Sequence, residues 1–158
     1  MTTLHRQANW KTMNPIITQV TAIPPSSLQV VLSNGRTIRL DVAEYLTSPG
    51  YEPLGDPQVF AGVTIEEWGH GIEWPIIDQG IPVETLVRLG REQAGAAYST
   101  TEFNAWMERN RLSLNDAAKA LGLTRRTIVY YHCGQKPIPR YIGLACEGWE
   151  ARQQRKTA

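Results

Sequence analysis

The stretch SLNDAAKALGLTRRTIVYYHCG, residues 113–134, decides how the second half of this chain folds. Ser113 and Asp116 form a capping box, which predicts that a helix begins after Ser113. Gly122 supplies the left-handed residue that ends this helix after Leu121. Thr124 then caps a second helix over residues 125–133, and Gly134 ends it.

Small side chains on the first of these helices allow the second to cross it closely. Ala117, Ala118 and Leu121 are expected to face inward, and Ile128 is expected to face them from the second helix. Two helices joined by a short Gly-containing turn meet the physical requirements of a helix-turn-helix.

Two further helices are predicted on either side of this pair. Ser99 and Glu102 form a capping box before Phe103, Trp106 and Met107, whose spacing places them on one face of a helix that stops at Asn110. After residue 134, two prolines frame the start of a fourth helix with an apolar stripe. These residues are Pro137, Pro139, Ile142, Ala145 and Trp149.

The first half of the chain has the pattern of an antiparallel sheet. Residues 28–32 and 37–40 are apolar runs joined through Asn34-Gly35, a turn that predicts a tight hairpin. Further strands are expected over residues 16–23, 60–68 and 71–75, the last two joined across Gly69-His70-Gly71. A helical turn over 41–46 and a helix over 82–89 complete this part. Trp68 and Trp74 are expected in its core, and the alternative is an aromatic groove for a small ligand.

The length and composition describe a packed protein with no sign of export. The chain has 158 residues, of which 42% are hydrophobic and 20% charged, so one domain or two small ones can be built. No apolar run is long enough to span a bilayer and no leader pattern begins the chain, so we expect a soluble, cytoplasmic protein. The two cysteines, Cys133 and Cys146, form no pattern typical of a disulfide framework or a zinc ribbon.

Charge divides the chain into an acidic front and a basic back. Residues 1–98 carry six basic and ten acidic side chains, whereas residues 99–158 carry ten basic and five acidic ones. This asymmetry favours a polyanion as the partner of the back part.

The front part resembles an uncharacterised bacterial domain, the family of unknown function numbered 2442. The residues that carry the resemblance are Leu28, Val30, Asn34-Gly35, Phe60, Val63, Ile65, Ile72-Glu73-Trp74-Pro75, Asp78 and Leu86. The resemblance implies an α+β fold and no established activity. It also implies Phe60, Val63 and Ile65 in a third strand.

The back part resembles the Cro/phage-repressor (Xre-type) family of helix-turn-helix DNA-binding domains from about Thr101 to Trp149. Ala118, Gly122, Ile128, Tyr131, Gly134, Pro137 and Pro139 stand where that family has its inward alanine, turn glycine, core residue, aromatic, cap glycine and prolines. Leu114 and Val129 depart from it, since they are apolar at places that are commonly polar.

This resemblance implies a set of DNA-binding residues. Arg125, Arg126 and Tyr130 would read bases from the helix over residues 124–133, since Arg can fork to guanine and Tyr can contact thymine. Four further residues would contact the phosphate backbone, namely Thr124 at the cap of this helix, Lys119, Lys136 and Arg140.

No pattern in the sequence indicates an enzyme. The chain has no phosphate-binding glycine loop, no G-x-S-x-G and no H-E-x-x-H, and we predict neither catalytic residues nor a cofactor. His132-Cys133 has no second ligand pair at metal spacing, so no metal site is expected. His70 is interpreted as a turn residue, and Glu66, Glu67 and Glu73 as solvent-facing charges.

The sequence therefore predicts an α+β protein in four parts. They are a flexible arm (1–14), a small antiparallel sheet with a helix (15–92), a linker (93–100) and an all-α, lambda-repressor-like helix-turn-helix domain (101–158). The expected function is bacterial transcription regulation by a homodimer that binds double-stranded DNA. The alternative is an antitoxin-like module whose acidic first domain binds a partner protein.

Overall fold

A computed structural model describes residues 15–157 and divides the chain into two compact units, Met1–Leu86 and Val87–Ala158. The boundary between these units lies within helix α4 (Val83–Gln93), whereas the sequence places a linker at residues 93–100. The domain limits drawn from the sequence stay a prediction, and the expected arm, residues 1–14, lies outside the described residues.

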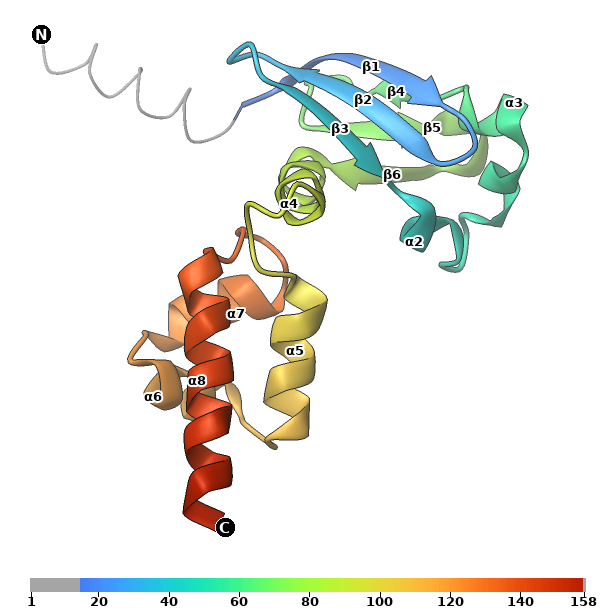
Figure 1. The fold of residues 1–158 in the computed structure, drawn as a ribbon. Coiled ribbons are helices and arrows are strands. Elements are labelled where there is room, and N and C mark those ends of the chain that lie inside the picture. Colours follow the sequence, from blue (N-terminus) through green and yellow to red (C-terminus); the bar gives the residue numbers. More distant parts are fainter. Residues whose placement is uncertain (1–14, 158) are drawn as a thin grey trace, which may run out of the picture. The chain divides into compact units, whose positions relative to one another are not determined.

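The first unit begins with an antiparallel sheet of three strands, β1 (Ile17–Ile23), β2 (Ser27–Leu32) and β3 (Thr37–Asp41), in the order β1-β2-β3 (Figure 1). The predicted hairpin is confirmed, with Val30 paired to Ile38. Its turn uses the two residues that predicted it: Gly35 adopts a positive φ of 83°, and the Asn34 side chain accepts a hydrogen bond from the backbone N–H of Arg36.

A second antiparallel sheet contains β4 (Thr64–Ile65), β5 (Gly71–Trp74) and β6 (Gln79–Pro82). The expected pairing across the Gly69–Gly71 turn is confirmed, since Ile65 pairs with Ile72. β6 was not expected, because its four residues bury only Ile81 and show no alternating pattern. β1 contacts this sheet, and the backbone N–H of Ile17 donates to the carbonyl of Gly69 at 2.8 Å.

The strand expected over residues 60–68 is wrong except at Thr64–Ile65. The chain instead forms a short helix, α3 (Pro57–Phe60), whose N-cap Asp56 accepts a hydrogen bond from the N–H of Gln58. An acidic cap followed by proline is a helix-start signal that outweighs the apolar spacing of the next residues.

The two tryptophans of the first unit differ in their burial. Trp74 is fully buried, and its indole Nε1 donates to the carbonyl oxygen of Phe60 at 2.9 Å. Trp68 is 70% exposed, so the expectation that it belongs to the core is wrong. Trp68 lies in the turn between β4 and β5, outside any strand that could direct its ring inward.

Short helical segments connect the strands of this unit. The predicted turn at 41–46 is α2 (Ala43–Leu46), where Asp41 accepts from the N–H of Ala43. Two 3-10 turns, η1 (Glu52–Gly55) and η2 (Pro75–Ile77), were not predicted. The predicted helix at 82–89 is α4, which begins one residue later because Pro82 ends β6.

The second unit contains four helices after α4, namely α5 (Thr100–Arg109), α6 (Leu114–Leu121), α7 (Arg125–His132) and α8 (Arg140–Thr157). All four were predicted, and Ser99, Ser113 and Thr124 are found as the N-caps of α5, α6 and α7. Gly122 is the C-cap of α6 as predicted, whereas α7 ends one residue earlier than predicted, at His132, with Cys133 as its C-cap. Figure 1 shows α8 as the longest of them, and it contacts α5 and α6.

A single apolar core holds these helices together. Its fully or nearly buried members are Phe103, Trp106, Met107, Ala117, Ala118, Ile128, Tyr131, Ile138, Ile142 and Cys146. The predicted stripe on α8 is wrong at Ala145, which is exposed, while the neighbouring Cys146 is buried. Burial raises the pKa of the Cys146 thiol to about 12, so this residue stays a neutral part of the core.

Among residues 15–157, no helix is long and apolar enough to cross a membrane.

Candidate nucleic-acid interface

Local hydrogen bonds fix both ends of α6 and the start of α7. Ser113 Oγ accepts from the N–H of Asp116 at 3.0 Å, and the Asp116 carboxylate accepts from the N–H of Ser113 at 3.1 Å. Hydrogen bonds from the side chain and the backbone of Ser113 to the carboxylate hold the pKa of Asp116 below its ordinary value. At the other end Gly122 has a φ of 69°, a left-handed conformation that turns the chain toward α7.

α7 begins after the cap residue Thr124 and exposes the arginines of its first turn to solvent. Thr124 Oγ1 accepts from the N–H of Thr127 at 3.2 Å and lies 2.9 Å from the Thr127 hydroxyl. Ile128 and Tyr131 are buried against the core, whereas Arg125 and Arg126 in the first turn are exposed. The positive side chains of α7 are therefore directed away from the core, at the end of the helix where free backbone N–H groups also attract anions.

Tyr130 lies between two cations on this exposed side. Arg126 Nε donates to the Tyr130 hydroxyl at 2.9 Å, and its Cζ lies 5.5 Å from the centre of the ring. Lys136 Nζ, from the loop between α7 and α8, lies 4.4 Å from the same ring centre. Both positions satisfy the geometry of a cation–π contact, so the ring holds two positive groups close together.

The structure therefore brings together three of the residues selected from the sequence, Arg126, Tyr130 and Lys136. Thr124 caps the same helix, and Arg125 is exposed beside Arg126. Lys119, in the last turn of α6, and Arg140, the first residue of α8, are also exposed. Within residues 15–157 no hydrogen bond or ring contact joins either of them to the Tyr130 cluster.

Two residues that the sequence reasoning did not select hold the loop after α7. Arg88 Nε donates to the carbonyl of Gly134 at 3.0 Å, and Arg88 also pairs with Glu92 at 3.0 Å. Glu92 Oε1 in turn accepts from the backbone N–H and the hydroxyl of Thr100, at 2.9 and 3.1 Å. This half-buried network joins the end of α4 to the start of α5 and to the loop that carries Lys136.

Arg88 and Gly134 are 46 residues apart, so no local pattern could have indicated their contact. The only sequence signal was the spacing of Arg88 and Glu92, which places them on neighbouring turns of one helix.

The side chain and the backbone of His132, for which no role as a metal ligand was expected, are held by α5. Its ring Nδ1 lies 2.8 Å from Asn104 Oδ1, and its carbonyl accepts from Asn104 Nδ2 at 3.1 Å. Among residues 15–157 no group of three His, Cys, Asp or Glu side chains is arranged to hold a metal ion.

The two residues that depart from the helix-turn-helix pattern, Leu114 and Val129, are both partly buried. Leu114 packs against the core of the second unit, which explains an apolar side chain at this place.

The exposed cations lie in a stretch of chain without acidic side chains. Residues 117–146 contain five Lys or Arg and no Asp or Glu. The charge difference is larger when the described residues are divided at the boundary between the units. Residues 15–86 carry two basic and nine acidic side chains, and residues 87–157 carry twelve basic and six acidic ones. A surface of this charge attracts polyanions at long range.

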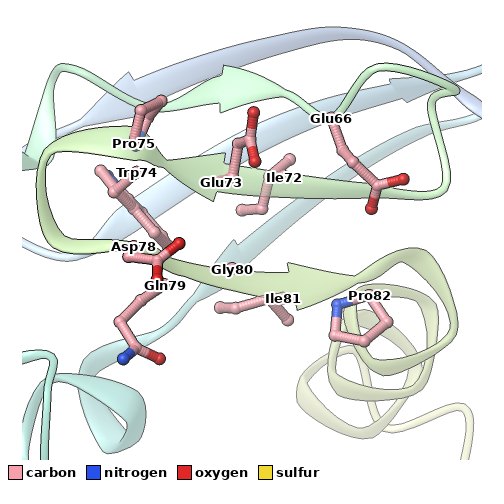
Figure 2. A pocket seen from close by; sticks show the side chains of 10 residues that line it. All are labelled: Glu66, Ile72, Glu73, Trp74, Pro75, Asp78, Gln79, Gly80, Ile81 and Pro82. Atoms are coloured by element: carbon pink, nitrogen blue, oxygen red, sulfur yellow. The ribbon is translucent and has the colours of Figure 1, made fainter.

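The acidic first unit has a shallow cavity of about 240 Å³ beside β5 and β6. Figure 2 shows Glu66, Glu73 and Asp78 at its rim, with their carboxylates pointing in different directions. The expectation that Glu73 is a solvent-facing charge fits its partial exposure.

Comparison with protein families gives a match for the first part of the chain. Residues 17–92 match the family described as "Protein of unknown function (DUF2442)". This chain is therefore an α+β protein whose first part is a domain of that kind.

A solved structure from Nitrosomonas europaea, named "Putative DNA Binding Protein NE0471", is 41% identical over 87% of each chain, with a TM-score of 0.57. The chain belongs to the same family as that protein.

A protein of unknown function from Rhodospirillum rubrum is 20% identical, covers 46% of this chain and 84% of its own, and has a TM-score of 0.39, too low to support an argument. The comparison with curated proteins found no match.

Proposed function

We propose that the chain is a bacterial transcription regulator whose second unit carries an Xre-type, lambda-repressor-like helix-turn-helix. In this proposal α6 and α7 are its two helices and α7 is the recognition helix. The chain acts as a homodimer on double-stranded DNA, because one recognition helix reads only a few base pairs.

The observation that carries the proposal is the side of α7 that faces solvent. Arg125 and Arg126 lie in the first turn of α7, which is where recognition helices contact base edges. No acidic side chain occurs from residue 117 to residue 146, so nothing in this segment neutralises them. The cap residue Thr124 leaves further N–H groups of this helix end available to a phosphate.

The Tyr130 cluster adds a reason to assign base reading to Arg126. The hydrogen bond to Tyr130 uses Arg126 Nε and leaves both terminal amino groups available, which is the pair of donors that can bind guanine O6 and N7. The name of the Nitrosomonas relative agrees with DNA as the ligand.

Selection from random duplex DNA, followed by sequencing of the bound fraction, tests the proposal. We expect a palindromic site that the wild-type protein binds and that R125A/R126A does not enrich. R155A is the matched control, because Arg155 is an exposed arginine in the last turn of α8. A wild-type protein that selects no site and binds no DNA at low salt would overturn the proposal.

Single substitutions separate base reading from phosphate contact. R126A should lower the preference for the selected site over unrelated DNA by about 1–3 kcal/mol. K136A should weaken binding to all sequences alike and reduce the slope of log K against log salt by about one unit. Equal effects of both variants on specificity would assign Lys136 to base reading.

A second candidate function rests on the first unit. Trp68 and Ile76 are 70% and 77% exposed there, in a part of the chain with nine acidic side chains. An antitoxin-like module that binds a basic partner protein through this unit would use such residues. W68A should then abolish complex formation with the partner while DNA binding is unchanged, and an effect on DNA binding alone would exclude it.

A further inference from the structure

One face of α8 exposes apolar residues to solvent on successive helical turns. Tyr141 and Leu144 are 68% and 69% exposed, and Ala145 and Gly148 are exposed beside them. These four residues, here named the α8 stripe, have the i, i+3, i+4, i+7 spacing of one helix face. The face that packs against the core is a different one, formed by Ile142, Gly143 and Cys146.

The two glycines of α8, Gly143 and Gly148, differ in the space available for a side chain within the second unit. A Cβ at Gly143 would lie 2.5 Å from Tyr98 Cδ2, so packing within the unit explains this glycine. A Cβ at Gly148 would meet nothing within 4 Å, yet a glycine inside a helix is unfavourable by about 0.5–1 kcal/mol relative to alanine. At Gly148 the α8 stripe therefore has a notch that the unit itself does not fill.

Charges of opposite sign flank the stripe on one side. Arg140 and Glu147 are seven residues, about two helical turns, apart and therefore lie on the same flank. Both are exposed, and neither forms an ion pair within residues 15–157, where Glu150 is the residue that pairs with Arg109. Within the described part of the chain, the flank thus presents a cation and an anion at the two ends of the stripe.

We propose that the α8 stripe is the surface through which two copies of this chain dimerise, with their α8 helices antiparallel about a two-fold axis. An antiparallel pairing centred on Leu144 places Tyr141 of one copy within one residue, about 1.5 Å along the axis, of the Gly148 notch of the other. The same rotation brings equal flanks together, so Arg140 of each copy lies within one residue of the level of Glu147 of the other. A parallel two-fold pairing would instead place this flank of the two copies on opposite sides of the interface, so Arg140 and Glu147 would not meet.

The partner is therefore a second copy because the surface is complementary to itself in shape and in charge. Two-fold symmetry makes every contact occur twice, which is the property of an isologous interface. The inference rests on the proposed function for its purpose, since a palindromic operator requires two recognition helices related by a two-fold axis. It also gives Arg140 a role apart from any contact with the DNA backbone.

Sedimentation equilibrium of the full chain without DNA tests the surface. We expect a concentration-dependent dimer whose dissociation constant rises about tenfold or more in L144D. I76D is the matched control, because Ile76 is an equally exposed apolar residue of the first unit and should leave the constant unchanged. A wild-type chain that stays monomeric, or equal losses in L144D and I76D, would overturn the inference.

A charge exchange tests the antiparallel arrangement. R140E and E147R should each weaken the dimer, because each places like charges together twice, and R140E/E147R should restore it. Failure of the double variant to recover would overturn the antiparallel pairing.

Binding to a duplex that contains one half-site distinguishes a failure of the dimer proposal from a failure of the proposed function. If L144D is monomeric but binds the half-site as the wild type does, both proposals stand. If the wild type dimerises through the stripe but binds no DNA, the dimer stands and the proposed function fails.

Discussion

Arg126 donates its Nε hydrogen to the hydroxyl of Tyr130, 2.9 Å away and one helical turn further along α7. The bond fixes the plane of a long, flexible side chain before any ligand is present. A side chain ordered in advance loses less entropy on binding than a free one, so Tyr130 acts here as a positioning residue for Arg126.

The hydroxyl of Tyr130 can be removed without removing its ring. Y130F should weaken binding to the selected site about fivefold, since one neutral hydrogen bond is worth about 1 kcal/mol. The salt dependence should be unchanged, because no charge is lost. Competition between the selected site and unrelated DNA at two salt concentrations measures both quantities, and a changed salt slope with unchanged specificity would contradict the positioning role.

The two glycines of α8 should respond in opposite directions to the same substitution. G143A should lower the free energy of unfolding by about 1–3 kcal/mol, because the new methyl meets the ring of Tyr98. G148A should raise it by about 0.5–1 kcal/mol, because the methyl enters open space in a helix. Urea denaturation at low protein concentration compares them, and a loss of stability in both variants would show that Gly148 is packed within its own unit.

The hydrogen-bond network of Glu92 should contribute more to the free energy of unfolding than an exposed side chain of α4 does. E92A leaves the half-buried Arg88 without its anion and Thr100 without an acceptor, at a cost of about 2 kcal/mol. E84A is the control, because Glu84 is exposed in the first turn of the same helix and should change stability by less than about 0.5 kcal/mol. Thermal unfolding of both variants gives the comparison.

The lowered pKa values of two carboxyl groups predict how the stability of the second unit changes at acidic pH. Hydrogen bonds from Ser113 lower the pKa of Asp116, and Arg109 lowers the pKa of Glu150. A pKa that is lower in the folded state gives stability that is present above the unfolded pKa, about 4, and is lost as the pH falls through the folded value. The wild type should therefore lose stability below about pH 4, and D116N/E150Q should lose less over the same range.

Urea midpoints measured between pH 6 and pH 3 test this expectation. A pH dependence that is identical in the double variant and the wild type would assign the acid response to other groups.

The helices of the second unit could be predicted because their signals are local. Ser113, Gly122 and Thr124 act on backbone groups within a few residues, so the caps are found where the sequence placed them. The contact of Arg126 with Tyr130 follows from the same helical spacing. The approach of Lys136 to the Tyr130 ring depends on the path of a loop, which the sequence does not specify.

The first unit was predicted less well because its strands are short and their partners are distant. β4 has only two residues, and β6 is defined by its pairing with β5. The apolar spacing at Phe60 favoured a strand, although Asp56 and Pro57 gave the signal for a helix. Trp68 shows that an aromatic residue between strands need not be buried.

The course of α4 limits how this protein could have been assembled from exchangeable parts. The family match ends at residue 92, but Arg88 and Glu92 already belong to the second unit and bind Gly134 and Thr100. A gene fusion that attached a different segment after residue 92 would leave the half-buried Arg88 and Glu92 without their acceptor and donors. The family match and the first compact unit thus end at different positions, and recombination in this family would have to preserve the part of α4 from residue 87 together with helices α5 to α8.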